Sequence, residues 1–304
     1  MTVAAGRNPH FTHRASLFAD RHFKWLVIAP SIIVLLLIGI YPIVHTGIVS
    51  FQDITMLAED TSWSGGKHYA ALFSDTRLWE SMGHTFLILA IALPIELVLG
   101  LLMAQLFLEK MPLKQVFVAL LIIPTVISPI VAGSTWRLMF DNQYGPINQI
   151  INWFTTEHVA ILWLSRPEWV YPAILVCEVW QWTPFMFLIL LAALSNVDRS
   201  LIEAAEIDGA SFWKIFFRIT LPVIKPVLII AILIRALDLF RIFDIIWAMT
   251  KGGPGTMTET ISIYTYIRAF KEFETSYAGA IAFLVIILLS IIVIFALKRV
   301  EIAR

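Results

Sequence analysis

Six long apolar segments dominate the sequence, at roughly residues 25–50, 84–108, 115–138, 170–194, 227–249 and 277–297. Each could form a helix that crosses the hydrocarbon core of a bilayer, which takes about 20 residues. Prolines interrupt several of them, and membrane helices tolerate prolines where neighbouring helices or cavity water satisfy the freed carbonyls. The pattern predicts an all-α membrane protein with six transmembrane helices and with both termini on the same side.

Composition agrees with a chain that lies largely in lipid. Of its 304 residues, 59% are hydrophobic and 14% are charged, whereas soluble domains carry about 25% charged residues. The net charge is zero, so no basic excess indicates a nucleic-acid partner. The only cysteine, Cys177, excludes a disulfide framework and a cysteine-based zinc site, and we interpret it as a small packed side chain.

The distribution of Lys and Arg sets the orientation. These residues are more frequent in the first 24 residues, in the second and fourth loops and at the C-terminus than in the three alternating loops. Because cytoplasmic loops carry the excess of basic residues, both termini are expected in the cytoplasm. The predicted organisation is a cytoplasmic tail (1–24), a single transmembrane domain (25–300) and a cytoplasmic end (301–304) of a multi-pass protein of the cytoplasmic (inner) membrane.

One compact polar insert interrupts the apolar pattern, and its residues 203–226 read EAAEIDGASFWKIFFRITLPVIKP. Ser200 and Glu203 have the spacing of a capping box, and Gly209 can adopt the left-handed conformation that ends a short helix. A second helix is expected to stop at Leu221-Pro222. Such a pair of helices could rest on lipid headgroups, which explains its apolar face but not its acidic cluster, or it could dock on a protein partner, which explains both.

The same insert resembles the cytoplasmic signature loop of permease subunits in binding-protein-dependent ABC importers. The matching pattern is E-A-A-x2-D-G-A-x5-F-x2-I-x-L-P, and residues 122–151 and 241–260 are similar to the carbohydrate-uptake branch of that family. The resemblance implies a MetI-like permease fold in which the loop 195–226 forms a coupling helix that docks on an ATPase subunit. The coupling residues that it implies are Glu203, Ala204, Ala205, Asp208, Gly209, Ala210 and Pro222.

The partners implied by this resemblance are a second homologous permease, two ATPase subunits and an extracytoplasmic solute-binding protein, with membrane lipid around the chain and a sugar as substrate. No phosphate-binding G-x4-G-K-[ST] pattern occurs in the chain. ATP and Mg²⁺ are therefore expected on the ATPase subunits and no cofactor on this chain. The histidines lack metal-site spacing and no nucleophile–base pair stands out, so the chain is not expected to be an enzyme by itself.

Charged residues recur every third position in the fifth apolar segment, at Arg235, Asp238, Arg241 and Asp244. Charges inside a membrane are costly, so these should face protein or a watery cavity. One interpretation is a polar strip beside a translocation path. The other is a self-satisfied ladder of i,i+3 ion pairs that fixes helix packing.

The fourth segment adds a second candidate for contact with substrate, formed by Trp180, Gln181 and Trp182 beside Glu178. Aromatic faces and polar groups together suit a sugar, although packing explains the tryptophans nearly as well, and Trp180 and Trp182 cannot share one helix face. Glu96 is interpreted as a buried, hydrogen-bonded acid rather than a pathway residue.

Two function hypotheses follow. The first is a permease driven by ATP hydrolysis on a separate subunit, and the second is a self-contained ion-coupled secondary transporter that uses the buried Asp/Arg strip as a proton relay. Within the first, a neutral di- or oligosaccharide is the leading substrate. Polyols, glycerol phosphate and anionic sugar derivatives stay open, because two arginines lie in the fifth segment.

Overall fold

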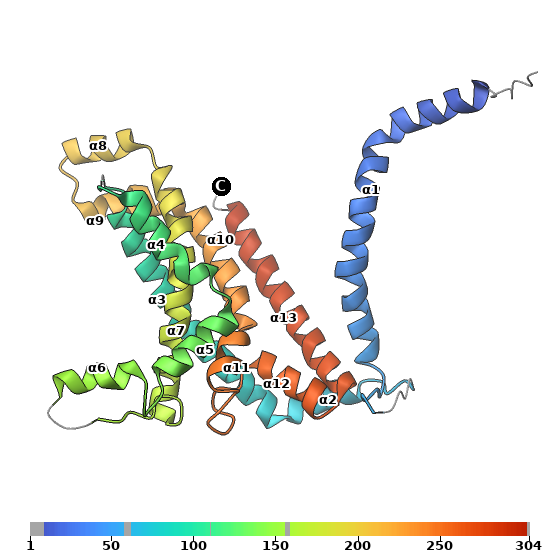
Figure 1. Ribbon diagram of the computed structural model, residues 1–304. Helices are drawn as coiled ribbons and strands as arrows, with labels where there is room; N and C mark the ends of the chain where they lie inside the picture. The colour runs from blue at the N-terminus through green and yellow to red at the C-terminus, as the bar shows by residue number, and fades with distance from the viewer. Residues whose placement is uncertain (1–8, 58–61, 110, 156–158, 303–304) are drawn as a thin grey trace, which may run out of the picture.

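The structure is a computed structural model that describes residues 9–57, 62–109, 111–155 and 159–302. In this part of the chain the regular elements are helices, which gather into one bundle (Figure 1). In chain order they are α1 (Pro9–Val49), α2 (Lys67–Ser74), α3 (Thr76–Leu106), α4 (Lys114–Val126), α5 (Pro129–Met139), α6 (Pro146–Phe154), α7 (Pro167–Ser195), α8 (Arg199–Ile207), α9 (Phe212–Ile215), η1 (Phe216–Thr220), α10 (Leu221–Phe240), α11 (Asp244–Met249), α12 (Ile261–Tyr266), η2 (Ile267–Lys271) and α13 (Thr275–Ile302).

Within the ranges that the structure describes, five helical stretches are long and apolar enough to cross a membrane, and α4 with α5 makes a sixth when the bent pair is taken as one span. The proline interruption in the segment 115–138 is sharp, because α4 and α5 meet at 94°. The residue before Pro129 is extended, at φ −58° and ψ 135°, since a proline disfavours the helical conformation of its predecessor. Pro129 then begins α5, where its missing amide costs no hydrogen bond.

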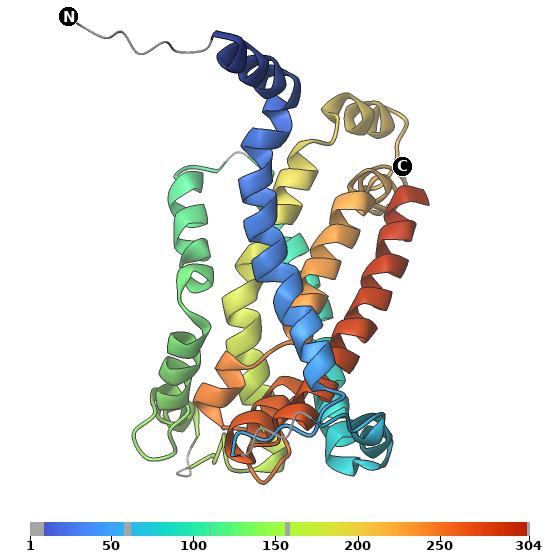
Figure 2. The ribbon, with the colours of Figure 1, turned by 90° about the vertical axis from the view of Figure 1, so that its right-hand side faces the viewer.

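The two ends of the bundle differ in what they carry. The early part of α1, the last turns of α13 and the helix α8 lie at one end, whereas α2, α6 and α12 lie at the other (Figures 1 and 2). This arrangement agrees with an even number of crossings. Of the predicted tail 1–24, residues 9–24 belong to α1, and residues 1–8 and 303–304 lie outside the described residues.

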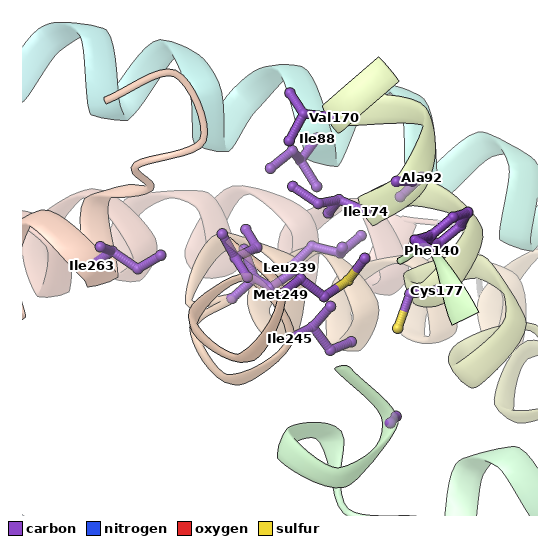
Figure 3. Packing of buried hydrophobic residues seen from close by; sticks show 14 residues of the cluster. Ile88, Ala92, Phe140, Val170, Ile174, Cys177, Leu239, Ile245, Met249 and Ile263 are labelled. Carbon is purple, nitrogen blue, oxygen red and sulfur yellow. The ribbon is translucent and has the colours of Figure 1, made fainter. Parts of the chain in front are cut away.

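The core lies where α3 and α7 meet α5, α10 and α11, and its buried side chains come from segments far apart in the sequence (Figure 3). Cys177 is fully buried there, which confirms that it is a packed side chain. At Gly100 of α3 an added Cβ would lie only 2.8 Å from Met186 Cβ of α7. The glycine therefore allows α3 and α7 to approach closely.

The first helix contributes little to this core. Along most of its apolar length α1 stands apart from the bundle, and it approaches α13 only toward its own C-terminal end (Figure 1). Gly47 marks that approach, because a Cβ at this position would lie 3.1 Å from the ring of Phe283.

The polar insert folds into helices whose boundaries differ from the expected ones. Asp198, not Ser200, caps α8, since its carboxylate accepts a hydrogen bond of 2.9 Å from the Ser200 amide. Ser200 lies within the helix, so the predicted capping box is wrong. The turn at Gly209 is confirmed, with φ at +73°.

The expected stop at Leu221-Pro222 is also wrong. The helix continues from α9 through the π-helical turn η1 into α10, and the Leu221 amide donates to the Phe216 carbonyl across that turn. Pro222 then falls in the first turn of α10, where its ring and missing amide are tolerated. Residues 212–240 therefore form one continuous helical stretch, in which α9 and α10 run in different directions (Figure 1).

Candidate functional site

The first candidate site is the exposed insert at the α8 end of the bundle. Ile207 is 88% exposed, and Phe212 and Trp213 are exposed beside it. All seven residues of the predicted coupling set are exposed or half-buried: Glu203, Ala204, Ala205, Asp208, Gly209, Ala210 and Pro222. They lie on or next to one projecting helical hairpin, so the structure leaves them accessible to another protein.

The base of this hairpin is anchored to the bundle. Ile202 of α8 and Leu221 of α10 pack against a buried cluster that contains Val197 and Ile224. An ion pair of 3.3 Å between Arg199 and Glu203 spans one turn of α8, but both side chains are exposed and so it contributes little. The apolar contacts at the base therefore hold the exposed tip in a defined position.

The second candidate site is a cavity of about 500 Å³ between α7, α10, α11 and the start of α5. Its polar lining comes from Glu178, Arg235, Asp238, Arg241 and Asp244, and Trp182 supplies an aromatic wall. Pro129 at the bend between α4 and α5 completes one side. The broken third span thus forms part of the cavity wall.

A buried ion cluster forms the floor of this cavity. Arg235 donates to both oxygens of Glu96, at 2.8 and 2.9 Å, and to Glu178 Oε1 at 2.9 Å. The side chains of Arg235, Glu96 and Glu178 are 1%, 0% and 3% exposed. Charges so far from water are tolerated only when they are paired and hydrogen-bonded, so the three residues stabilise one another. The interpretation of Glu96 as a buried, hydrogen-bonded acid is confirmed.

The charged residues of the fifth segment do not continue as one ladder. Arg235 and Asp238 approach within 3.9 Å, and Arg241 donates to Asp238 at 2.5 Å. α10 ends at Phe240 and Asp244 begins α11 after a break. Among the described residues Asp244 has no recorded ion pair or hydrogen bond from its side chain, although it lines the same cavity.

The fourth-segment candidates separate in space. Trp182 lies in the cavity with the guanidinium of Arg235 4.6 Å from its ring centroid. Trp180 points elsewhere and packs edge-on against Trp136, at a centroid distance of 5.7 Å. Gln181 is buried against the α4–α5 break, where its amide donates to the Ile127 carbonyl at 2.8 Å.

Glu178 is the cavity residue that sequence reasoning undervalued. It was noted beside the tryptophans but not chosen, whereas the structure places it in the ion cluster and in the cavity lining. The available signal was its position as an acid within an apolar segment, which favours a functional role.

A second polar network lies at the opposite end from α8, around Asp75. This residue caps α3 by accepting from the Leu78 amide at 3.2 Å, and it also accepts from the hydroxyls of Tyr264 and Tyr277. Burial alone would raise the pKa of Asp75, but these hydrogen bonds and the charge of Arg268 outweigh it and hold the pKa below 3.8. The network closes the end that carries α2 and α12, beside a cavity of about 400 Å³.

Comparisons with known proteins agree with this architecture. The chain is 34% identical over 275 residues to the sulfoquinovosyl glycerol transport system permease protein SmoG of Agrobacterium fabrum, covering 90% of this chain and 88% of the relative. It is 36% identical over 250 residues to the trehalose/maltose transport system permease protein MalF of Thermococcus litoralis, covering 82% and 84%.

Among solved structures, the fold is similar to a chain of a bacterial ABC transporter involved in the import of the acidic polysaccharide alginate. The TM-score is 0.81 at 22% identity, with 95% of this chain and 98% of the other covered. Residues 69–301 match the family described as binding-protein-dependent transport system inner membrane component. This chain therefore belongs to that family, and it is a membrane-spanning permease component of an ABC importer rather than a self-contained secondary transporter.

Proposed function

We propose that this permease carries a sugar or sugar derivative across the cytoplasmic membrane, driven by ATP hydrolysis on separate subunits. The observation that carries the proposal is the anchored, exposed hairpin of α8 and α9, joined without a break to the helix that lines the cavity. The named relatives transport sulfoquinovosyl glycerol and trehalose or maltose, which supports a sugar as the solute.

In this proposal α8 is the coupling helix. The residues Glu203, Ala204, Asp208 and Gly209 contact an ATPase subunit, Ala205 and Ala210 pack behind them, and Pro222 lies in the first turn of α10. ATP and Mg²⁺ are held by two such ATPase subunits, and this chain is not an enzyme by itself. A second homologous permease completes the membrane path.

The orientation follows from the same assignment. The α8 end of the bundle, with both termini, faces the cytoplasm, and the end that carries α2, α6 and α12 faces outward (Figure 1). The excess of basic residues on the α8 side supports this orientation. A solute-binding protein then delivers the sugar at the α2–α6–α12 end, and the cavity lined by Trp182, Arg235, Asp238, Arg241 and Asp244 is part of the path.

Single cysteines test the orientation and the docking together. Ile207→Cys and Trp153→Cys place thiols at positions that are 88% and 77% exposed, at opposite ends of the bundle. The native Cys177 is fully buried and is a poor target for reagents. We expect an impermeant maleimide added outside the membrane to label Trp153→Cys but not Ile207→Cys, and only Ile207→Cys to cross-link to the ATPase.

Labelling of Ile207→Cys from outside would contradict the orientation. If neither variant forms a cross-link to the ATPase, the proposed docking of α8 is wrong. The transport assignment has its own test. Sugar uptake that persists in cells without a partnering ATPase would contradict the proposed energy source.

A further inference from the structure

Charge is divided unequally along the polar insert. Residues 198–208, which include α8, carry four carboxylates and one arginine, whereas residues 209–226 carry three basic side chains and no carboxylate. The three basic residues, Lys214, Arg218 and Lys225, are exposed, and none of them forms an ion pair within the part of the chain that the structure describes. The two halves of the insert therefore suit partners of opposite charge.

Exposed aromatic rings lie beside these basic residues on α9 and η1. Trp213 and Phe217 are 64% and 58% exposed, and their rings stack at a centroid distance of 5.9 Å. Lys214 and Arg218 follow them with the same four-residue spacing, which puts neighbours on one helix face. Phe216 on the other side is buried. The four exposed side chains form the α9 surface, which is turned away from the rest of the chain.

The length of the adjoining span places the α9 surface at the level of the lipid headgroups. The apolar stretch Phe212–Met249 has 38 residues, about twice what the hydrocarbon core requires. α10 alone has 20 residues and is long enough to cross it. α9 precedes α10, runs in a different direction and lies closer to the bundle than α8 does (Figure 1). The α9 surface therefore lies where the chain enters the membrane.

The chemistry of the α9 surface matches an anionic lipid. Aromatic side chains favour the boundary between hydrocarbon and water, and long basic side chains extend from apolar surroundings toward phosphate groups. Phosphatidylcholine carries a choline cation beside its phosphate, whereas an anionic lipid such as phosphatidylglycerol has an unopposed negative charge. Unpaired basic side chains are therefore expected to favour the anionic lipid.

From this arrangement we infer that the α9 surface binds the headgroup of an anionic phospholipid, with Trp213 and Phe217 at the hydrocarbon boundary and Lys214 and Arg218 on the phosphate. The inference rests on the proposed function, which places the α8 end at the cytoplasmic leaflet, where anionic lipids create a negative surface potential. The insert then has two partners: α8 contacts the ATPase, and α9 with η1 contacts the membrane.

The test measures which lipid lies beside Phe217 in the complete complex with its companion permease and ATPase subunits. Phe217→Cys is labelled with a fluorophore, since the native Cys177 is fully buried. The complex is placed in nanodiscs of phosphatidylcholine and phosphatidylglycerol in equal parts, in which a small fraction of one lipid or the other carries a doxyl quencher near its headgroup. Because each basic side chain near an anionic surface contributes about fivefold in affinity, we expect doxyl-phosphatidylglycerol to quench at least about threefold more strongly.

A pair of double variants then assigns the preference to two side chains. Lys214→Gln with Arg218→Gln removes the basic half of the α9 surface, and we expect the two doxyl lipids to quench this variant equally. Lys114→Gln with Lys298→Gln removes the same charge from α4 and α13, and the control should keep the preference. Sugar import by each variant shows that the complex is assembled.

Three results would overturn the inference. They are equal quenching of the unsubstituted complex by the two doxyl lipids, quenching by neither lipid, which would show that water or the ATPase covers the α9 surface, and an equal loss of preference in the two double variants. Absence of sugar import by the unsubstituted complex would instead overturn the proposed function. The quenching measurement does not depend on import, so the two failures are distinguishable.

Discussion

Replacing Arg235 with alanine tests whether the buried ion cluster holds the bundle together. The substitution removes hydrogen bonds of 2.8, 2.9 and 2.9 Å and leaves the carboxylates of Glu96 and Glu178 only 0% and 3% exposed. Removing one partner of a buried ion pair costs about 3–5 kcal/mol, because an uncompensated charge stays buried. Since 1.4 kcal/mol is about a factor of ten, the ratio of folded to unfolded protein should fall by roughly 10²–10³ or more.

The assay is reversible unfolding of the purified chain in mixed micelles with increasing SDS, followed by circular dichroism. We expect Arg235→Ala to lose about 3–5 kcal/mol. The triple variant Arg235→Met, Glu96→Gln, Glu178→Gln should regain most of that loss, because it leaves no buried ion without a partner. A single variant within about 1 kcal/mol of the wild type would refute the reasoning, since such a change is typical of an exposed ion pair.

The remaining predictions concern the turn at Gly209, the contact of α3 with α7 at Gly100, and Asp75 at the end of the bundle that carries α2 and α12. Gly209→Val should insert normally, but the complex that contains it should hydrolyse ATP without matching uptake. Gly209→Asn should stay coupled, because Asn tolerates the φ of +73° and Val does not. Normal uptake per ATP in the Val variant would contradict this. Gly100→Ala should lower the free energy of unfolding in SDS by about 1–3 kcal/mol, because the added Cβ would lie 2.8 Å from Met186 Cβ. The control Gly83→Ala on the same helix should be nearly neutral, because its added Cβ would meet no atom within 4 Å. Asp75 has a lowered pKa, so its contribution to stability is present above its ordinary value of 3.8 and is lost as pH falls through the folded-state value. Unfolding midpoints measured from pH 6 to pH 3 should fall less steeply below pH 4 for Asp75→Asn than for the wild type, and parallel curves would disprove the assignment.

Much of the helix content is predictable because long apolar runs have few alternatives in lipid. The errors arise where prolines act through their surroundings. The interruption at Pro129 amounts to a bend of 94°, a size that the sequence does not give, and Pro222, where a stop is predicted, produces no break because a π-helical turn precedes it. The residue types alone do not predict either outcome, because the effect of a proline depends on whether the backbone amides and carbonyls around it find hydrogen-bond partners.

The two candidate sites also differ in how far the sequence predicts them. The hairpin of α8 and α9 is local, so glycine and the pattern around Asp208 predict its turn. The cavity depends on pairs that are distant in sequence, since Arg235 is 139 residues from Glu96 and 57 residues from Glu178. Spacing of three residues predicts contacts only within one helix, which explains why Asp238–Arg241 was foreseeable and the buried cluster was not.

The uninterrupted helix across Pro222 has a mechanical consequence for the proposed importer. A stop at this proline would place a flexible joint between the hairpin and the bundle, and a push on α8 would be absorbed there. The observed helix runs without a break from Phe212 to Phe240, and it carries Arg235 on the same continuous element as the end of the hairpin. The first break comes at residues 241–243, beside the cavity. A displacement of the hairpin can therefore pass along a continuous helix to Arg235 and to the break beside it, which is where the charged lining lies.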